Sequence, residues 1–215
     1  TPCRIVSLVP SQTELLYDLG LTEEVVGITK FCIHPHEWYT RKNRIGGTKQ
    51  LNIEKIKSLQ PDLIIGNKEE NTIQDIVALQ KIAPVWMSDI KCYDDALSMI
   101  RSVGEIVGKK KESDKLVTKI EASFQTVKGL FKNKTVLYYI WDNPGMVAGK
   151  ITFIDSILSI IGFQNICSQA RYPMWDNSEA IKPNYILLSS EPYPFKQEDC
   201  VKFQKEYPDS RIVIV

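Results

Sequence analysis

Arg4-Ile-Val-Ser-Leu-Val-Pro10 begins an architecture that occurs twice in the chain. This apolar run is followed by a helical stretch, Thr13-Glu-Leu-Leu-Tyr-Asp-Leu19, a stop at Gly20-Leu21, and later Glu54-Lys-Ile56 and Pro61-Asp-Leu-Ile-Ile65. The second half repeats the order with Val136-Leu-Tyr-Tyr-Ile140, Phe153-Ile-Asp-Ser-Ile-Leu-Ser-Ile-Ile161, Gly162-Phe163, Glu179-Ala-Ile181 and Pro183-Asn-Tyr-Ile-Leu-Leu188. Any two α/β domains share a rhythm of strands and helices, but the ordered set favours true repetition. We therefore expect two similar α/β lobes with a ligand cleft between them.

Composition is ordinary for a soluble globular protein of one large or two small domains. The 215 residues are 43% hydrophobic and 25% charged. A formal charge of +1 gives no electrostatic reason to bind nucleic acid or an anionic membrane. No apolar run approaches the ~20 residues of a membrane span. The chain begins Thr1-Pro2 and ends in the apolar run Arg211-Ile-Val-Ile-Val215, so we expect both ends to be trimmed.

Five cysteines are scattered along the chain, at Cys3, Cys32, Cys92, Cys167 and Cys200. Because their number is odd and no two form a Cys-x-x-Cys pair, neither a disulfide framework nor a structural zinc site is expected. Most are expected to be small buried hydrophobes, which slightly favours a reducing compartment.

Short apolar runs alternate with helical patterns, which predicts parallel sheets built from βαβ units. The candidate strands are Arg4–Val9, Val25–Ile28, Leu63–Ile65, Val85–Met87, Val136–Ile140, Ile186–Leu188 and Ile212–Val215. The resulting fold class is α/β: two parallel-sheet lobes, 1–92 and 133–215, the second expected to be truncated. A helical segment, 93–132, connects them.

That connecting segment contains no strand candidate and no proline between Asp94 and Phe131. One helix is expected over Asp94–Val107, and Gly108-Lys-Lys-Lys111 separates it from a second. In the second helix one face carries Leu116, Ile120, Phe124, Val127 and Phe131. A long helix between the lobes would be a rigid connector, so limited closure on ligand binding is expected.

Ligands of parallel α/β lobes lie beyond the carboxyl ends of the strands. The segments that follow the predicted strands are rich in aromatic residues, proline and methionine, which suits a broad, flat, partly apolar ligand. For any single aromatic residue, the alternative is that it fills the interface between the lobes. The candidate ligand-binding residues are Pro10, Ser11, Phe31, Cys32, His34, Asn67, Lys68, Trp141, Met146, Arg171, Tyr172, Trp175 and Tyr193.

The sequence contains one candidate metal-binding motif and none of the common catalytic motifs sought. Cys32-Ile-His34-Pro-His36 is the one plausible metal constellation, and contact with a metal carried by the ligand is favoured over a site made by the protein alone. The chain has no phosphate-binding loop, no Gly-x-Ser-x-Gly elbow and no His-Glu-x-x-His motif. Glu69-Glu70 would ordinarily cap a helix or match its dipole. The sequence therefore favours a binding protein over an enzyme, with no cofactor of its own.

Several of these segments together resemble a known family. The resemblance begins at Arg4-Ile-Val-Ser-Leu-Val-Pro-Ser-Gln-Thr-Glu-Leu15 and continues through Gly27-Ile-Thr-Lys-Phe-Cys-Ile-His-Pro35, Arg44-Ile-Gly-Gly-Thr48, Leu51-Asn-Ile-Glu-Lys-Ile56, Leu59-Gln-Pro-Asp-Leu-Ile-Ile65, Gly66-Asn-Lys-Glu-Glu-Asn71, Arg171-Tyr-Pro173 and Leu188-Ser-Ser-Glu-Pro-Tyr-Pro-Phe195. The chain is similar to the class III, or helical-backbone, periplasmic substrate-binding proteins of ABC importers. These serve cobalamin, haem and ferric siderophores, and the cobalamin-binding branch is the most similar.

The resemblance implies a monomer with two lobes joined by one long helix, outside the cytoplasm in the periplasm or on a lipid anchor. It also implies a metal-chelate ligand, here a corrinoid, and a permease dimer as partner. In the cobalamin branch a glutamate on each lobe pairs with permease arginines. Glu179 matches in the second lobe, and Glu69, Glu70 and Asp75 compete in the first. Asn67 replaces an aromatic residue of some relatives, which puts the ligand in question.

Two alternatives remain open. Haem or a ferric siderophore could replace the corrinoid, with Tyr193, Tyr172 or His34 as an axial iron ligand in the haem case. Siderophore binding would call on Arg171 and Arg44. A cytoplasmic corrinoid- or metal-handling protein, or an enzyme on the same fold, is the other alternative, and the full-length N-terminus would discriminate between them.

Overall fold

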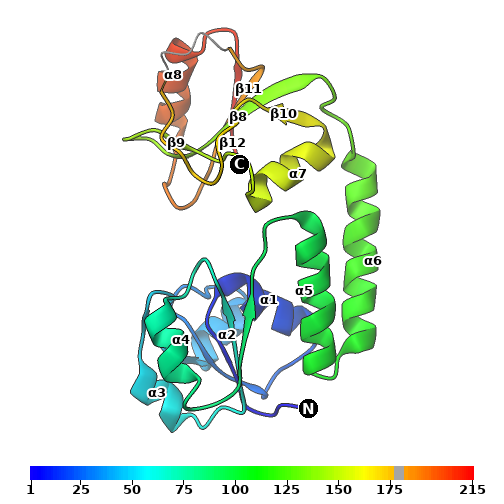
Figure 1. Cartoon of the computed structure of the whole chain (residues 1–215), viewed down its shortest axis with the longest axis vertical. Coiled ribbons are helices and arrows are strands. Elements are labelled where there is room, and N and C mark those ends of the chain that lie inside the picture. The colour runs from blue at the N-terminus through cyan, green and yellow to red at the C-terminus, as the bar shows by residue number, and fades with distance from the viewer. Residues whose placement is uncertain (177–181) are drawn as a thin grey trace. The chain divides into compact units, whose positions relative to one another are not determined.

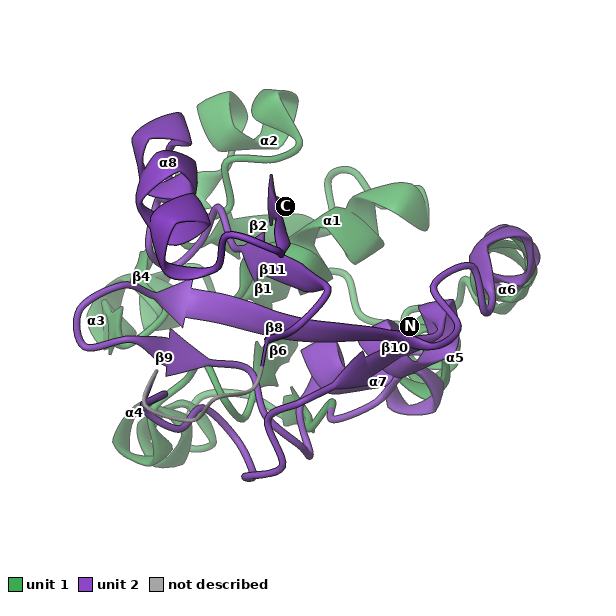
Figure 2. Ribbon diagram, turned by 90° about the horizontal axis from the view of Figure 1, so that it is seen from above, with its two compact units in different colours: residues 1–90, 97–119 green, residues 91–96, 120–215 purple. Residues whose placement is uncertain are grey.

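A computed structural model describes residues 1–176 and 182–215 of the chain. They form two compact units, residues 1–90 with 97–119 (unit 1) and residues 91–96 with 120–215 (unit 2), coloured separately in Figure 2. Helices α5 (Tyr93–Ile106) and α6 (Lys110–Val127) contribute residues to both units. None of the helices in the described ranges is long and apolar enough to span a membrane.

Unit 1, whose helices α1 to α4 are labelled in Figure 1, is built on a parallel sheet with the strand order β3-β2-β1-β6-β7. Its strands are β1 (Ile5–Ser7), β2 (Val25–Ile28), β3 (Asn43–Arg44), β6 (Leu63–Asn67) and β7 (Val85–Ser88). The crossovers carry helices α1 (Pro10–Asp18), α2 (His36–Arg41), α3 (Ile53–Ser58) and α4 (Ile73–Leu79), with a short hairpin of β4 (Gly46–Gly47) and β5 (Gln50–Leu51). Strand residues such as Val6 and Ile64 are fully buried together with Ile56 and Leu79 of the helices, so helices cover the apolar strands.

Unit 2 repeats this topology. Its strands are β8 (Lys134–Trp141), β10 (Phe163–Asn165), β11 (Tyr185–Leu188) and β12 (Arg211–Ile214), in the parallel order β10-β8-β11-β12, and β9 (Met146–Val147) pairs antiparallel with β8. Helices α7 (Phe153–Ile161) and α8 (Gln197–Glu206) complete it. The order matches β2-β1-β6-β7 of unit 1 strand for strand, so the internal repetition predicted from the sequence is confirmed.

All seven predicted strands are present, most with their limits moved by one or two residues. Strands β3, β4, β5, β9 and β10 were not predicted, because each has only two or three residues and no apolar run marks it. The second connecting helix was predicted to end at Phe131 but ends at Val127. Gly129 adopts a left-handed φ of 72°. Phe131 instead stacks on Phe163 with ring centres 4.2 Å apart. The predicted Glu179-Ala-Ile181 segment lies outside the described residues.

Candidate functional site

The carboxyl edge of unit 1 is the edge of its sheet where β1, β2, β6 and β7 end. Pro10 and Ser11 begin α1 directly after β1, and Asn67 and Lys68 lie at the end of β6. The loop after β2 carries the remaining candidates of this unit, Phe31, Cys32 and His34. The structure therefore brings the sequence-predicted residues of unit 1 to one edge, as parallel strands require.

A buried polar network centred on Gln12 underlies this edge. The Gln12 side chain is 1% exposed and donates from Nε2 to the Gly66 carbonyl at 2.9 Å and to Ser88 Oγ at 2.7 Å. Asn67 Nδ2 donates to the same Ser88 hydroxyl at 3.0 Å. Gln12 Oε1 is buried and accepts no hydrogen bond from the described residues. The network ties the start of α1 to the ends of β6 and β7, and nothing in the sequence pairs Gln12 with Ser88.

The turn after β6 presents Lys68, Glu69 and Glu70 to solvent. Asn67 Oδ1 accepts hydrogen bonds from the backbone N–H groups of Glu69 at 2.8 Å and Glu70 at 3.3 Å. Helix α4 begins only at Ile73, and the Thr72 hydroxyl caps it. The interpretation of Glu69 and Glu70 as a helix cap is therefore wrong. Both acids stand on a turn built by Asn67, which sequence reasoning treated as a ligand contact only.

The three candidate residues in the loop after β2 differ in their exposure to solvent. Cys32 is fully buried, and its sulfur lies 3.1 Å from the hydroxyl oxygens of both Thr13 and Thr29. Phe31 is 52% exposed and His34 is exposed. Among residues 1–176 and 182–215 no group of three or more His, Cys, Asp and Glu side chains could hold a metal ion. Cys32 thus anchors the loop, and Phe31 and His34 are the side chains that a ligand could reach.

The carboxyl edge of unit 2 carries an aromatic series. Trp141 ends β8 and packs edge-to-face against Tyr193, which follows β11, with ring centres 5.3 Å apart. Tyr193 in turn contacts Phe195 at 4.6 Å, and Phe195 contacts the buried Phe203 at 5.8 Å. Trp141 is 38% exposed. The series therefore begins at the surface and is anchored in the core of unit 2.

Trp175 occupies a different environment from Trp141. It lines a small cavity of about 130 Å³ with Tyr139, Asp142 and Lys202, and its side chain hydrogen-bonds the Tyr207 hydroxyl. The buried hydroxyls of Tyr139 and Tyr207 lie 2.9 Å apart. Burial, and secondly the Tyr207 hydroxyl, raise the pKa of Tyr139 far above its usual value. Trp175 is thus part of a buried polar cluster, and its replacement would disturb the packing of unit 2.

Met146, Arg171 and Tyr172 lie on strands and loops that flank β8. Met146 pairs with Met174 in an isolated antiparallel bridge, and Trp175 N–H donates to the Gly145 carbonyl at 2.8 Å. Arg171 has a left-handed φ of 66°, and its guanidinium lies 5.6 Å from the centre of the Tyr172 ring. These residues therefore share one segment beside β9 and the turn that precedes it.

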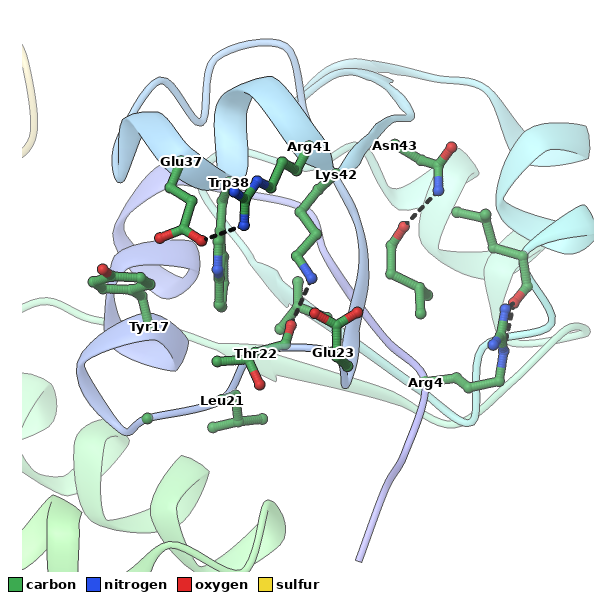
Figure 3. Close-up of a pocket in the computed structure, with 14 residues that line it drawn as sticks. Arg4, Tyr17, Leu21, Thr22, Glu23, Glu37, Trp38, Arg41, Lys42 and Asn43 are labelled. Carbon is green, nitrogen blue, oxygen red and sulfur yellow. Dashed lines mark hydrogen bonds and ion pairs between the residues drawn. The ribbon is translucent and has the colours of Figure 1, made fainter.

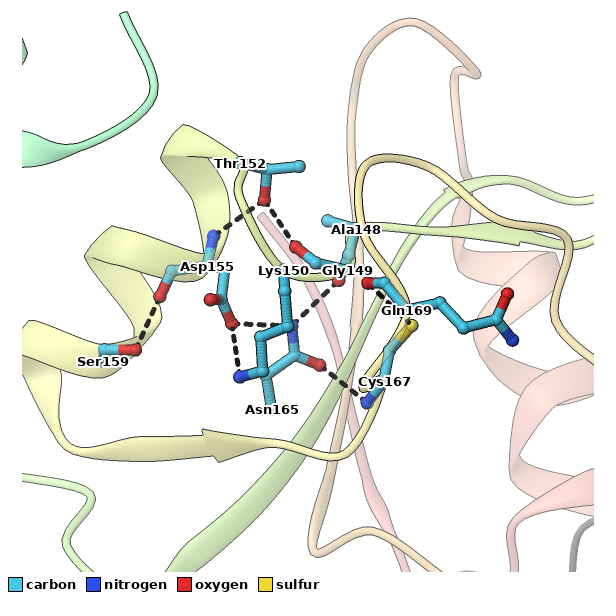
Figure 4. Close-up of polar contacts among 9 residues, drawn as sticks. All are labelled: Ala148, Gly149, Lys150, Thr152, Asp155, Ser159, Asn165, Cys167 and Gln169. Carbon is cyan, nitrogen blue, oxygen red and sulfur yellow. Dashed lines mark hydrogen bonds and ion pairs between the residues drawn. The ribbon is translucent and has the colours of Figure 1, made fainter.

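A polar cluster fixes the loop that follows β9 (Figure 4). Asp155 Oδ1 accepts hydrogen bonds from Lys150 Nζ and Asn165 Nδ2, both at 3.0 Å. The Asn165 amide also donates to the Ala148 carbonyl at 2.9 Å, and Thr152 caps α7. The side chains of Lys150, Thr152, Asp155 and Asn165 each have a partner within the cluster. Its role is to hold the loop and the start of α7 against the end of β10.

A cavity of about 690 Å³ lies at the opposite edge of unit 1, where β1 and β2 begin (Figure 3). Its polar groups contact one another: Arg41 pairs with Glu37 at 2.8 Å, and Lys42 Nζ donates to the Thr22 carbonyl at 2.6 Å. None of the residues predicted to bind ligand lines it. Its size alone does not make it the ligand site, since ligands of parallel sheets bind at the carboxyl edge.

Comparison with known proteins places the chain among transport proteins. A family model described as periplasmic binding protein matches residues 5–206. An ABC transporter substrate-binding lipoprotein of Bacillus subtilis, YvrC, is 30% identical over 175 residues, which are 76% of this chain and 55% of that protein. The chain thus spans about half the length of that relative.

Two further relatives differ in what they bind. The vitamin B12-binding protein of Pectobacterium carotovorum is 22% identical over 201 residues, covering 89% of this chain and 72% of that protein. The crystal structure of the periplasmic haem-binding protein HutB of Vibrio cholerae superposes with a TM-score of 0.85 at 22% identity, covering 99% of this chain and 89% of that one. At this identity the superposition shows a shared fold.

Proposed function

The chain belongs to the periplasmic binding protein family, and from that membership we propose that it is the substrate-binding component of an ABC importer. The family consists of transport substrate-binding proteins, so binding and delivery are its task and no catalytic residues are assigned. We place the protein outside the cytoplasm, either in a periplasm or on a lipid anchor, as the Bacillus subtilis relative is a lipoprotein. The cleft between two lobes stays a prediction from the sequence.

The cargo we propose is a corrinoid. The observation that carries this proposal is the Trp141–Tyr193 pair, which offers a partly exposed apolar surface at the carboxyl edge of unit 2. Aromatic faces suit a broad planar ligand because they bury much area at little conformational cost. The vitamin B12-binding relatives support the same cargo.

Haem is the second candidate, and one observation favours it. The Tyr193 hydroxyl has no hydrogen-bond partner among the described residues, although its ring is held between Trp141 and Phe195. A phenol oxygen presented in this way could bind the iron of a haem. The haem-binding structural neighbours are consistent with this alternative.

The partner we propose is a dimeric permease, contacted through acidic residues. Glu69 and Glu70 are exposed on a turn whose backbone is held by Asn67, so both residues are presented from a defined stretch of backbone. Arginine pairs well with carboxylates because its planar donors bind both oxygens. Glu179, which lies outside the described residues, is the matching acid proposed for unit 2.

A ligand screen by thermal unfolding tests the proposed cargo. Cyanocobalamin, dicyanocobinamide, haemin and a ferric siderophore are each titrated against the protein. A ligand that binds only the folded state raises the unfolding temperature as its concentration passes the dissociation constant. The corrinoids should produce this rise. A rise with haemin alone, lost in Tyr193→Phe, would select the haem alternative instead.

A further inference from the structure

The turn between β8 and β9 determines how Trp141 is held. Strand β8 ends at Trp141, β9 begins at Met146, and Asp142–Gly145 form the turn between them. The Trp141 indole N–H donates back into this turn, to the Asn143 carbonyl at 3.2 Å. The orientation of the Trp141 ring is therefore coupled to the conformation of the turn.

An ion pair connects the turn to helix α8. The Nζ of Lys202, on α8, donates to Asp142 Oδ1 at 2.6 Å, and only 15% of the Asp142 side chain is exposed. Among residues 1–176 and 182–215, Lys202 is the only hydrogen-bond and ion-pair partner of this carboxylate. Hydrogen bonds between charged groups are stronger than neutral ones, and a mostly buried carboxylate that loses its partner costs its desolvation. Asp142 thus depends on a residue 60 positions along the chain.

Side-chain packing does not fill the space between the turn and α8. The cavity of about 130 Å³ is lined by Asp142 and Gly145 of the turn and by Lys202 of α8. At its far end the turn is held through the Gly145 carbonyl, which accepts a hydrogen bond from the Trp175 N–H at 2.8 Å. The ion pair with Lys202 holds the near end, next to Trp141, where the cavity interrupts apolar contact with α8.

The same cavity is lined by a second acid, Glu206 of α8. The hydrogen bond to Asp142, and then the charges of Asp142 and Glu206, raise the pKa of Lys202, so the lysine is charged at neutral pH. It is the one cation among the described residues that line this cavity. Without it, two carboxylates would line the same cavity and repel each other. This repulsion would favour movement of the Asp142 turn toward solvent.

A comparable carboxylate of unit 2 is held differently. Asp155 is also mostly buried and pairs with Lys150 at 3.0 Å, but it accepts a further hydrogen bond from Asn165 at 3.0 Å. The loss of one donor at Asp155 therefore leaves another in place. Asp142 has no second donor among the described residues, so the position of its turn depends on Lys202.

We propose that Lys202 is a positioning residue for cargo binding: its ion pair with Asp142 fixes the β8–β9 turn and thereby orients the Trp141 ring for the ligand. Lys202 itself does not contact the cargo and acts through the turn. The contact between Trp141 and a corrinoid rests on the proposed function, whereas the orientation of the ring by Lys202 is testable in the free protein.

The first experiment follows the Trp141 ring without ligand. The protein is labelled with fluorotryptophan, and Trp141→Phe assigns the fluorine NMR signal of Trp141. Lys202→Met should shift this signal, and Lys202→Arg should keep it at the position of the parent. Lys182→Met is the matched control, because it removes an ion pair with Asp209, at 3.1 Å, at the opposite edge of unit 2, where β11 and β12 begin. It should leave the Trp141 signal in place.

An unmoved Trp141 signal in Lys202→Met, or an equal shift in Lys182→Met, overturns the proposal. If Lys202→Met does not fold, Asp142→Asn decides in its place, since it removes the charge of the acid and keeps the size of the side chain. It should shift the Trp141 signal, and an unmoved signal overturns the proposal.

The second experiment is a double-mutant cycle in cyanocobalamin affinity, measured by equilibrium dialysis. Lys202→Met should weaken binding by about fivefold, or about 1 kcal/mol, at the upper end of the range for ion pairs with an exposed partner. Asp142→Asn should also weaken binding, although it changes the charge in the opposite sense, because both changes release the same turn. In the Trp141→Ala background, Lys202→Met should cause no further loss. Lys202→Arg and Lys182→Met should keep the affinity of the parent.

The alternatives to positioning give different results. Opposite effects of Lys202→Met and Asp142→Asn on affinity would indicate a direct electrostatic contact with the ligand and overturn the proposal. Parent affinity in Lys202→Met, or a fivefold loss that persists in the Trp141→Ala background, would overturn it as well. If no corrinoid binds, the proposed cargo is wrong, and the fluorine signal of Trp141 in the free protein still decides whether Lys202 orients the ring.

Discussion

Replacing Trp141 by Ala should weaken corrinoid binding, whereas a matched aromatic replacement away from the carboxyl edges should not. Trp141 ends β8 with 38% of its surface exposed and packs edge-to-face against Tyr193 at 5.3 Å. Its indole N–H donates to the nearby Asn143 carbonyl, at 3.2 Å. The exposed part of the ring is therefore available to a ligand, while the rest is held by unit 2.

The magnitude follows from the exposed area. A tryptophan side chain offers up to about 250 Å², so the 38% exposed leaves about 95 Å² for a ligand to cover. At about 25 cal/mol per Å² this area contributes about 2 kcal/mol. The dissociation constant of cyanocobalamin should rise by about thirtyfold. Removing the buried remainder of the ring and its contact with Tyr193 should also lower the free energy of unfolding, by about 3 kcal/mol.

Equilibrium dialysis with cyanocobalamin measures the affinity, and urea unfolding measures the stability. Tyr17→Ala is a closely matched control, since Tyr17 is 39% exposed and forms an edge-to-face pair with Trp38, also at 5.3 Å. Tyr17 lines the 690 Å³ cavity of unit 1, at the edge of the sheet opposite the carboxyl ends of its strands. Tyr17→Ala should lose comparable stability and keep full affinity. The reasoning would be refuted if Trp141→Ala bound cyanocobalamin as tightly as the parent, or if both variants lost the same affinity.

Three further expectations concern stability, pH and docking. Gly66→Ala should lower the free energy of unfolding by about 1–3 kcal/mol, read from the urea midpoint, because the new methyl would meet a side-chain oxygen at 2.7 Å and a sulfur at 2.9 Å; an unchanged midpoint would contradict this. Backbone N–H groups, chiefly that of Lys91, hold the pKa of Asp95 below its usual value, so its stabilisation is complete above the unfolded-state pKa of about 3.9 and is lost as pH falls through the folded-state pKa. The stability gap between the parent and Asp95→Asn should therefore close in acid, and a gap independent of pH would show that another interaction is responsible. Glu69→Lys should reduce uptake in reconstituted vesicles without changing ligand affinity, whereas Glu54→Lys, in the first turn of α3, should not; normal uptake in both would remove the docking role.

Much of the fold was predictable because apolar runs report buried parallel strands directly. Val25–Ile28 and Phe153–Ile161 were predicted with the limits that the structure has. Polar residues flank the strand, and Thr152 and Gly162 cap the helix. Strand β10 was missed because Phe163-Gln-Asn165 pairs with β8 through only three residues, two of them polar. Phe131 has the spacing expected of the preceding helix, so the helix was predicted to include it. The chain instead turns at Gly129, and Phe131 packs on Phe163.

The candidate site was predictable only in outline. Strand ends correctly placed Trp141 and Tyr193 at one edge, because parallel strands bring their carboxyl ends together. Spacing could not show that Cys32 is buried between two threonines, since that depends on contacts across 19 residues. The same limit hid the Gln12–Ser88 hydrogen bond, which joins residues 76 positions apart.

Direct titration of the purified protein with cyanocobalamin tests the central claim. Equilibrium dialysis, with free and bound corrinoid quantified by absorbance, gives both the stoichiometry and the dissociation constant. Saturable binding of one corrinoid per chain, weakened in Trp141→Ala and retained in Tyr17→Ala, is the predicted result. Binding that never saturates, or no binding of cyanocobalamin while haemin binds stoichiometrically, would contradict the proposal that this protein captures a corrinoid.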